Sequence, residues 1–109
     1  MNRLGYATRL NTTMPIAPET RFTQARDLEL REVPEGYVVY ERTRDRLHFL
    51  NGAAAFVLQC CDGTTRADEL PAMLAAAFRL TADPVAEVDA CLARLVSEQL
   101  VEGELPPPA

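Results

Sequence analysis

The chain has 109 residues, 48% of them hydrophobic, with a net charge of −5 and a sequence pI of about 4.8. This length suits one small domain with a modest core. The acidic balance argues against tight binding to nucleic-acid phosphates, which requires clustered positive charge, and no apolar run approaches the roughly 20 residues of a membrane span. Without a signal-peptide pattern in the first 25 residues, we expect a cytoplasmic protein.

The two ends of the chain are predicted to lie outside the folded domain. Residues 1–25 show no periodicity and contain Pro15 and Pro18, so we expect a flexible N-terminal arm. Consecutive prolines near the C-terminus cannot continue a helix, which makes residues 103–109 a proline-rich tail. The predicted domain therefore spans residues 26–102.

Three short strands are predicted at the start of this domain. Residues 28–32 alternate apolar and polar side chains, as a half-buried strand does. Residues 37–41 are aromatic and β-branched, which favours a second strand, and residues 46–50 form the third. The links at 33–36 and 42–45 are short, so neighbouring strands must pair antiparallel in a meander whose edges are the first and third strands.

Helices are predicted to follow the strands. Asn51 is a suitable N-cap for a helix over residues 52–61, which Gly63 would end. The last helix has Asp83 as its cap and Pro84 at its first position, where proline is favoured. Its apolar stripe consists of Val85, Val88, Leu92, Leu95 and Val96.

The start of the middle helix is ambiguous. Thr65 resembles the first residue of a capping box, yet that start would place Pro71 in the helix interior, where proline is unfavourable. We favour Asp68 as the cap, after an irregular turn. The predicted inner face of this helix consists of Leu70, Met73, Leu74, Ala77 and Phe78. The fold class is α+β: a three-stranded antiparallel sheet followed by three helices, an order like that of a winged helix-turn-helix.

The sequence offers little for catalysis. His48 is the only histidine, and no partners for a catalytic triad or a zinc site stand at recognisable positions. The three cysteines, Cys60, Cys61 and Cys91, have no CxxC spacing and read as small hydrophobic residues without disulfides. We therefore expect a binding protein that needs no metal or cofactor, not an enzyme.

A winged-helix transcription regulator that binds DNA is one alternative. Acidic residues outnumber arginines between residues 66 and 101, whereas a recognition helix on phosphates would carry the opposite sign. The basic cluster Arg42, Arg44 and Arg46 lies in a hairpin, where it would be a solvated loop or a contact for an acidic peptide. Salt dependence separates the two classes of protein, because a DNA binder loses affinity steeply as salt rises.

The third strand is an unusual edge. The first strand carries charges and is followed by Pro34, the usual protection of an edge, whereas the third presents Leu47 and Phe49 on one face and His48 and Leu50 on the other. We infer that an extended peptide adds a strand here, with the last helix as the second wall of its groove. The predicted contacts are Arg46, Leu47, His48, Phe49, Val85, Val88, Asp89 and Leu92.

The stretch LHFLNGAAAFVLQCCDG, residues 47–63, resembles the hallmark of PqqD-like proteins, also called RiPP recognition elements. That family's pattern is a strand ending in Leu-Asn, a short helix and Asp-Gly, then a helix that opens with two acidic residues and an Ile or Leu, and a last helix that closes with Leu-x-x-Leu and a terminal Leu-Val. The residues that match are Leu50, Asn51, Asp62, Gly63, Asp68, Glu69, Leu70, Leu92, Leu95, Leu100 and Val101. The family's small hydroxylated residue is replaced here by Arg66, and its glycine before the last leucine by Gln99.

The resemblance implies a three-stranded sheet packed on three helices and a protein that binds the leader part of a ribosomally made precursor peptide. The leader would pair with Leu47, His48 and Phe49 and lie against the helix that begins at Pro84. The protein would then present it to a modifying enzyme, often a radical SAM protein. Two further readings stay open: an obligate subunit of an enzyme whose catalytic residues lie on its partner, and a homodimer that closes the edge strand by self-association.

Overall fold

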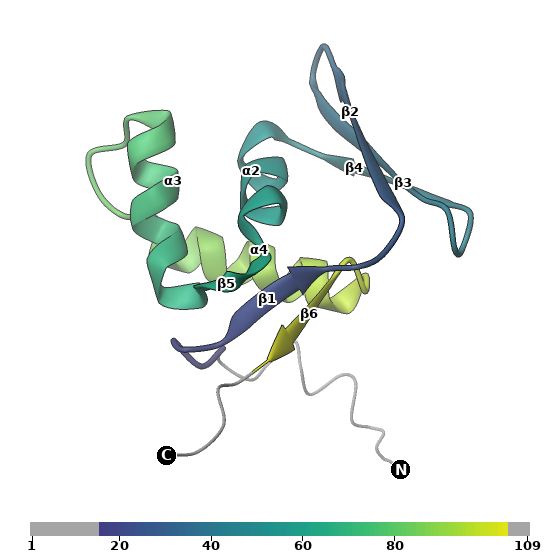
Figure 1. Ribbon diagram of the computed structural model, residues 1–109. Helices are drawn as coiled ribbons and strands as arrows, with labels where there is room; N and C mark the ends of the chain where they lie inside the picture. Colours follow the sequence, from purple (N-terminus) through teal and green to yellow (C-terminus); the bar gives the residue numbers. More distant parts are fainter. Residues whose placement is uncertain (1–15, 105–109) are drawn as a thin grey trace.

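The computed structural model describes residues 16–104 (Figure 1). Its strands are β1 (Arg21–Gln24), β2 (Leu28–Val33), β3 (Gly36–Glu41), β4 (Arg46–Leu50), β5 (Asp62–Arg66) and β6 (Val101–Glu104). Its helical segments are α2 (Gly52–Cys60), the 3-10 turn η1 (Ala67–Glu69), α3 (Leu70–Phe78) and α4 (Val85–Ser97). The α+β class is therefore as predicted.

The predicted antiparallel meander is present. Its strand order is β2-β3-β4, so β2 and β4 are the edges. On one face Tyr40 lies opposite Leu47, and Val38 lies opposite Phe49. The other face packs on the helices and contains the fully buried Val39 and Leu50. Alternation along each strand separates these two faces.

A second sheet was not predicted, and the single-sheet expectation is wrong in this respect. β1 pairs with both β5 and β6 in the order β5-β1-β6, and Phe22 of β1 is buried in the core. These strands are short, and their pairing partners lie far apart in the chain. Their pattern alone therefore does not reveal them.

The second sheet changes the reading of the chain ends. Strand β1 lies inside residues 1–25, which the sequence assigns to the flexible arm, and β6 extends into the predicted tail. Residues 1–15 and 105–109 are outside the described residues, as is the question of whether the arm covers β4. The division into arm, domain and tail otherwise stays a prediction.

Helix α2 begins as predicted. The side chain of Asn51 accepts a hydrogen bond from the N–H of Ala54 at 2.8 Å. After the helix, Gly63 takes a left-handed φ of 87°, and the carboxylate of Asp62 accepts from the N–H groups of Thr64 and Thr65, both at 2.9 Å. These bonds hold the pKa of Asp62 down, at about 2. The chain thus turns directly into β5 and does not continue as an irregular loop.

The start of α3 differs from both sequence alternatives. The N-cap is Arg66, whose N–H donates to the Glu69 carboxylate at 2.7 Å, which is the half of a capping box that does not depend on the N-cap side chain. The 3-10 turn η1 then leads into α3 and places Pro71 in its first turn, where proline is tolerated. Asp68 is instead paired with the side chain of Arg66. The arginine that departs from the family pattern therefore still occupies the capping position.

The predicted inner face of α3 is only partly correct. Leu70 and Leu74 are buried, but Met73 and Phe78 are 37% and 45% exposed, and Ala77 is exposed. The buried side of the helix instead consists of Leu70, Pro71, Leu74 and Ala75. The ring of Phe78 packs edge-on against an aromatic ring on the neighbouring helix α2.

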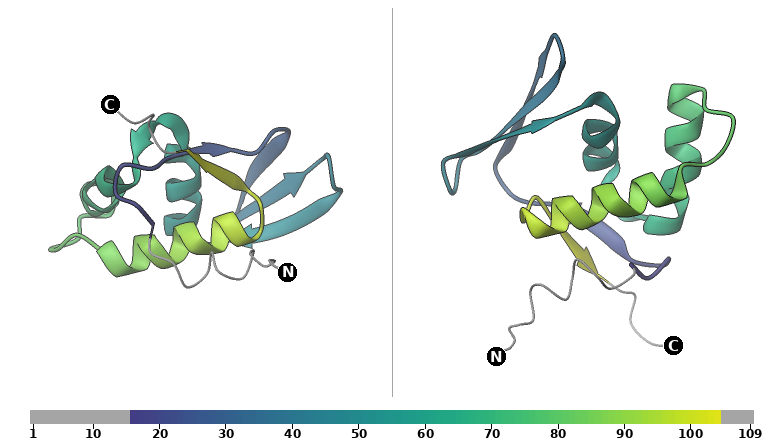
Figure 2. Two further views of the ribbon diagram at one scale, coloured as in Figure 1. Left: turned by 90° about the horizontal axis from the view of Figure 1, so that it is seen from below. Right: turned by 180° about the vertical axis from the view of Figure 1, so that it is seen from behind.

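Helix α4 runs along the domain and contacts α2, α3 and β6 (Figure 2). It begins at Val85 after Pro84, with no side-chain cap. The prediction of Asp83 as the cap and Pro84 as the first helical residue is therefore wrong: Pro84 is the N-cap, and Asp83 contributes only its backbone carbonyl, which accepts from the N–H of Val85 at 2.9 Å. The buried stripe of α4 consists of Val88, Leu92 and Leu95. Within residues 16–104, no helix is both long and apolar enough to span a bilayer.

Candidate functional site at the junction of β4 and α4

Strand β4 exposes apolar side chains on its outer face. Leu47 is 69% exposed and Phe49 is 50% exposed, and both lie on the face that sequence alternation predicts. Among residues 16–104, β4 pairs only with β3. The backbone edge on its other side is therefore free of strand partners over that part of the chain.

His48 points the other way, toward the helices. Its Nε2 lies 3.2 Å from Oε1 of Glu41 on β3, and its Nδ1 lies 3.2 Å from Oε1 of Glu98 at the end of α4. A neutral imidazole donates from one nitrogen only, whereas an imidazolium donates from both. A neutral His48 therefore donates to only one of the two carboxylates at a time, whereas Glu41 also has arginine donors.

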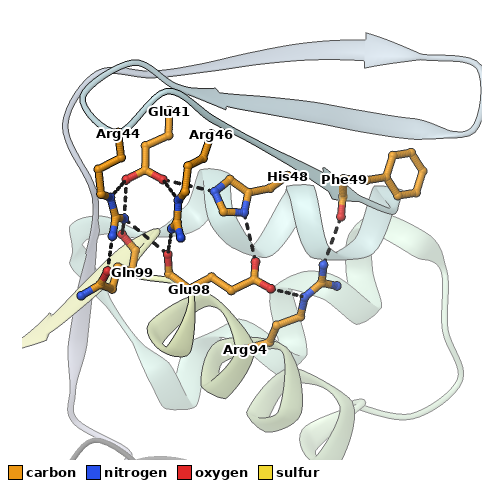
Figure 3. A network of polar contacts seen from close by, with 8 residues as sticks. All are labelled: Glu41, Arg44, Arg46, His48, Phe49, Arg94, Glu98 and Gln99. Atoms are coloured by element: carbon orange, nitrogen blue, oxygen red, sulfur yellow. Dashed lines mark hydrogen bonds and ion pairs between the residues drawn. The ribbon is translucent and has the colours of Figure 1, made fainter.

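Glu41 is the centre of the polar network drawn in Figure 3. This carboxylate is 1% exposed and accepts from Arg44, Arg46 and His48. Burial alone raises its pKa, but the hydrogen bonds from His48, Arg44 and Arg46 outweigh burial and lower the pKa below its ordinary value. Glu41 is thus an ionised group inside the fold, held by three donors from β4 and the turn before it.

The same arginines bind the C-terminal end of α4. Arg46 donates to the carbonyl of Glu98 at 2.9 Å, and Arg44 donates to the carbonyl of Gln99 at 3.3 Å. Positive charge near the last helical carbonyls is favourable because these carry the negative end of the helix dipole. Gln99 has a left-handed φ of 63°, which explains why the family pattern has glycine there.

Arg94 connects α4 to the open edge of β4. Its Nη2 donates to the carbonyl of Phe49 at 3.2 Å, and its Nε lies 3.5 Å from the Glu98 carboxylate. The guanidinium approaches β4 from the side of α4, opposite β3 (Figure 3). Arg94 therefore occupies the Phe49 carbonyl, a hydrogen-bond acceptor that an added strand would use.

A groove of about 400 Å³ opens beside this contact. Its walls come from the start of α2, from α3 and from one side of α4, and they are mostly apolar. The lining residues are Asn51, Ala53, Ala54, Val57, Leu74, Glu87, Val88, Ala90, Cys91 and Arg94. Arg94 belongs both to the groove and to the β4 contact, so the groove adjoins the C-terminal end of β4.

The structure separates the residues that the sequence groups as peptide contacts. Arg46, His48 and the carbonyl of Phe49 contact the C-terminal end of α4, whereas the side chain of Leu47 lies on the outer face of the sheet. Val88 and Leu92 belong to the hydrophobic core, at 1% and 0% exposure, although Val88 also forms part of the floor of the groove. Their peptide contacts stay a prediction.

Val85 and Asp89 lie toward the start of α4. They line a different cavity of about 200 Å³ together with Ile16, Pro18 and Pro71, among others. In the described residues the polar contacts between β4 and α4 involve Arg94 and Glu98, which do not line this cavity. These two predicted contacts are therefore remote from the β4 junction along the helix.

Sequence reasoning missed Arg94 and Glu98, which make the junction. A signal for them exists: Glu87, Cys91, Arg94 and Glu98 recur at three- and four-residue spacing and form one flank of α4 beside its apolar stripe. By helical spacing alone, the charged residues Glu87, Arg94 and Glu98 indicate a solvated side of the helix. Its role becomes visible only when β4 is placed next to it.

The cysteines show no sign of reactivity. Burial raises the pKa of Cys61 to about 12, and burial also raises the pKa values of Cys60 and Cys91. Over residues 16–104, no cluster of histidine, cysteine and acidic side chains is arranged to hold a metal ion.

These features define a class of protein: a small α+β domain whose edge strand is held against its last helix beside an apolar groove. The family model described as coenzyme PQQ synthesis protein D (PqqD) matches residues 36–101, from β3 to the start of β6. The chain belongs to this family of RiPP recognition elements. The resemblance seen in the sequence is thereby confirmed. No curated protein and no solved structure matches the chain.

The family sets the general context of the protein. PqqD proteins take part in the biosynthesis of PQQ and of other ribosomally made, modified peptides. They are non-catalytic accessory or chaperone proteins, and they work with peptide-modifying enzymes.

Proposed function

We propose that the protein captures the leader segment of a ribosomally synthesised precursor peptide by strand addition to residues 46–50. It then presents the peptide to a modifying enzyme, such as a radical SAM protein, without catalysing a reaction itself. The observation that carries this proposal is the position of β4: it is an edge strand that adjoins an apolar groove through Arg94.

The energetics require both the strand and the groove. About four backbone hydrogen bonds at a net 0.5–1.5 kcal/mol each give roughly 2–6 kcal/mol. Micromolar affinity needs about 8 kcal/mol, before the cost of ordering the peptide. Two apolar side chains buried in the groove, at about 1.5–3 kcal/mol each, supply the difference. The groove therefore selects the peptide sequence, while the strand edge accepts any extended backbone.

The outer face of β4 offers additional contacts. Side chains on neighbouring strands lie about 4.5–5.5 Å apart when directly opposite. A guest strand would place every second side chain next to Leu47 and Phe49, which are exposed on that face. Its remaining side chains would point toward the groove, so side chains on both faces of the guest would contact the protein.

The basic hairpin gives no support to the DNA-binding alternative. Arg42 is paired with Glu29, and Arg44 and Arg46 are paired with Glu41. These arginines are engaged with carboxylates of the same sheet and would have to leave them to bind phosphate. A salt titration tests this point, because strand addition to an apolar site depends weakly on salt and phosphate binding depends steeply on it.

The proposal is tested by backbone amide exchange of the full chain. The probe is the leader segment of a precursor peptide encoded beside the gene, prepared as a synthetic peptide. We expect slower exchange at the outward-facing amides of residues 46–50, and no change in β2, the other edge of the same sheet. Binding that leaves residues 46–50 unaltered would overturn the proposal, as would slow exchange there in the free protein caused by a homodimer.

A further inference from the structure

Arg94 holds a backbone acceptor of the edge strand. Its guanidinium donates to the Phe49 carbonyl at 3.2 Å, and the side chain is 53% exposed. In an antiparallel ladder the N–H and C=O of one residue point to the same side. A strand added next to Phe49 needs that carbonyl, so it must displace Arg94.

Within the described part of the protein, the displaced guanidinium has only a weak alternative partner. Its contact with Glu98 is an exposed pair at 3.5 Å, which contributes little. The other oxygen of the Glu98 carboxylate lies 3.2 Å from Nδ1 of His48, and the Glu98 carbonyl accepts from Arg46. Glu98 is therefore shared with β4 and pairs only weakly with Arg94.

The groove itself is electrically polarised. The charged residues of its lining are Glu87 and Arg94, which are two turns apart on α4 and thus about 10 Å apart along the helix axis. The wall between them is apolar, with Ala90 and Cys91 facing the groove. A guest that places a carboxylate at the Arg94 end meets a half-exposed guanidinium whose ion pair with Glu98 is weak, whereas a carboxylate at the Glu87 end meets a like charge.

We propose that Arg94 is a specificity-determining residue that selects guest strands carrying an aspartate or glutamate next to the segment paired with Phe49. This inference rests on the proposed function and adds the chemical class of the guest. In the free protein the Arg94 guanidinium donates a hydrogen bond to the Phe49 carbonyl. In the complex a backbone N–H of the guest donates to that carbonyl, and the guest's carboxylate accepts from the Arg94 guanidinium. Arginine suits this exchange because its planar fork binds a carboxylate through two parallel hydrogen bonds.

A random 12-residue peptide library displayed on phage provides a probe that requires no knowledge of the natural precursor. The library is selected on the full wild-type chain, on Arg94→Glu and on Arg26→Glu. Arg26 is an exposed residue between β1 and β2, so its replacement makes the same change in net charge away from the groove. We expect acidic residues at one position among peptides selected on wild type and on Arg26→Glu, and basic residues at that position on Arg94→Glu.

The strongest peptide is then synthesised with its acid and with the matching amide, and both are measured against wild type and Arg94→Gln. On wild type the acid should bind roughly tenfold more tightly than the amide, the typical value of a hydrogen-bonded charge. On Arg94→Gln that preference should disappear, while the amide peptide binds as well as it does to wild type. A merely structural role of Arg94 would weaken both peptides equally.

The outcomes separate the two proposals. Selected peptides that slow exchange at residues 46–50 but show no coupling to Arg94 overturn the specificity role and leave strand addition intact. Selected peptides that bind without affecting residues 46–50, or a library that yields no binder, overturn strand addition and the role of Arg94 with it.

Discussion

The imidazole of His48 lies 3.2 Å from the buried carboxylate of Glu41, so the only histidine of the chain joins the edge strand to the centre of the polar network. Glu41 is ionised because donors from β4 and the preceding turn surround it. Through its other nitrogen, His48 also reaches Glu98 at the end of α4. The network therefore fixes the position of the open strand relative to the helix that forms the groove.

Replacing Glu41 with glutamine should destabilise the protein in a pH-dependent way. Because the folded pKa of Glu41 is lowered, its stabilising contribution is complete above the ordinary glutamate pKa of about 4.3 and is lost as the pH falls through the lowered value. At pH 7 we expect Glu41→Gln to reduce the free energy of unfolding by about 2–4 kcal/mol. Urea unfolding at several pH values measures this difference, which should shrink below about pH 4.

Glu29→Gln is the matched control, since Glu29 forms exposed ion pairs on the outer face of the same sheet. Exposed pairs contribute little, so its effect should be small. Equal losses for both variants at pH 7 would show that the Glu41 network is no more important than surface pairing.

Leu47→Asp should separate peptide binding from folding. Leu47 is 69% exposed, so we expect the free energy of unfolding to change by no more than about 0.5 kcal/mol. Affinity for a strand-adding peptide should fall by roughly tenfold or more, because an apolar neighbour of the guest is replaced by a charge. Calorimetric titration measures the affinity, and denaturant unfolding measures the stability.

Two variants define the limits of that experiment. Leu50→Ala removes a fully buried side chain and should cost about 2–5 kcal/mol of stability. Val85→Asp changes an exposed residue at the far end of α4 and should leave peptide affinity unchanged. If Val85→Asp weakens binding as much as Leu47→Asp, the guest extends along the whole of α4, as the sequence suggests.

Gly36→Ala changes a residue of β3 and should disturb the neighbouring strand β4. Gly36 has a φ of 151°, and a Cβ atom there would overlap with the carbonyl oxygen of Leu50. We expect a loss of about 1–3 kcal/mol in thermal or urea unfolding. Gly52→Ala is the control, because its Cβ would meet only ordinary contacts. A stable Gly36→Ala protein would show that the hairpin can shift without cost.

The cysteines should report on the groove. Burial raises the pKa values of Cys60, Cys61 and Cys91, so alkylation by iodoacetamide at pH 7.5 should be slow relative to a free thiol, since the thiolate is the reactive form. Cys91 lines the groove and Cys60 does not. A bound peptide should therefore slow the modification of Cys91 alone, as followed by mass spectrometry. Equal protection of Cys60 would point to a global change in stability.

Much of this protein could be predicted from local patterns. Alternation predicts β2, aromatic and β-branched composition predicts β3, and the short links between β2, β3 and β4 leave no arrangement other than an antiparallel meander. The cap at Asn51 placed the start of α2, and alternation put Leu47 and Phe49 on the face opposite His48. These features depend on neighbours in the chain, which is why one sequence is sufficient for them.

Other features depend on contacts between distant residues. The second sheet joins residues 21–24 to segments around residues 64 and 102, and short strands carry too little pattern to announce such pairing. The same limit applies to the site. The sequence predicts that the start of α4 forms the groove wall, whereas the crossing of β4 over α4 brings Arg94 and Glu98, near the end of that helix, to the edge strand.

The sequence by itself determined that β4 would be an edge with apolar side chains, because alternation and link length are local properties. Only the tertiary structure decided which part of α4 faces that edge, and that Glu41, His48 and Arg94 tie them together. Helical periodicity defines the faces of a helix but not its position along a strand, and that position is set by how the core packs as a whole.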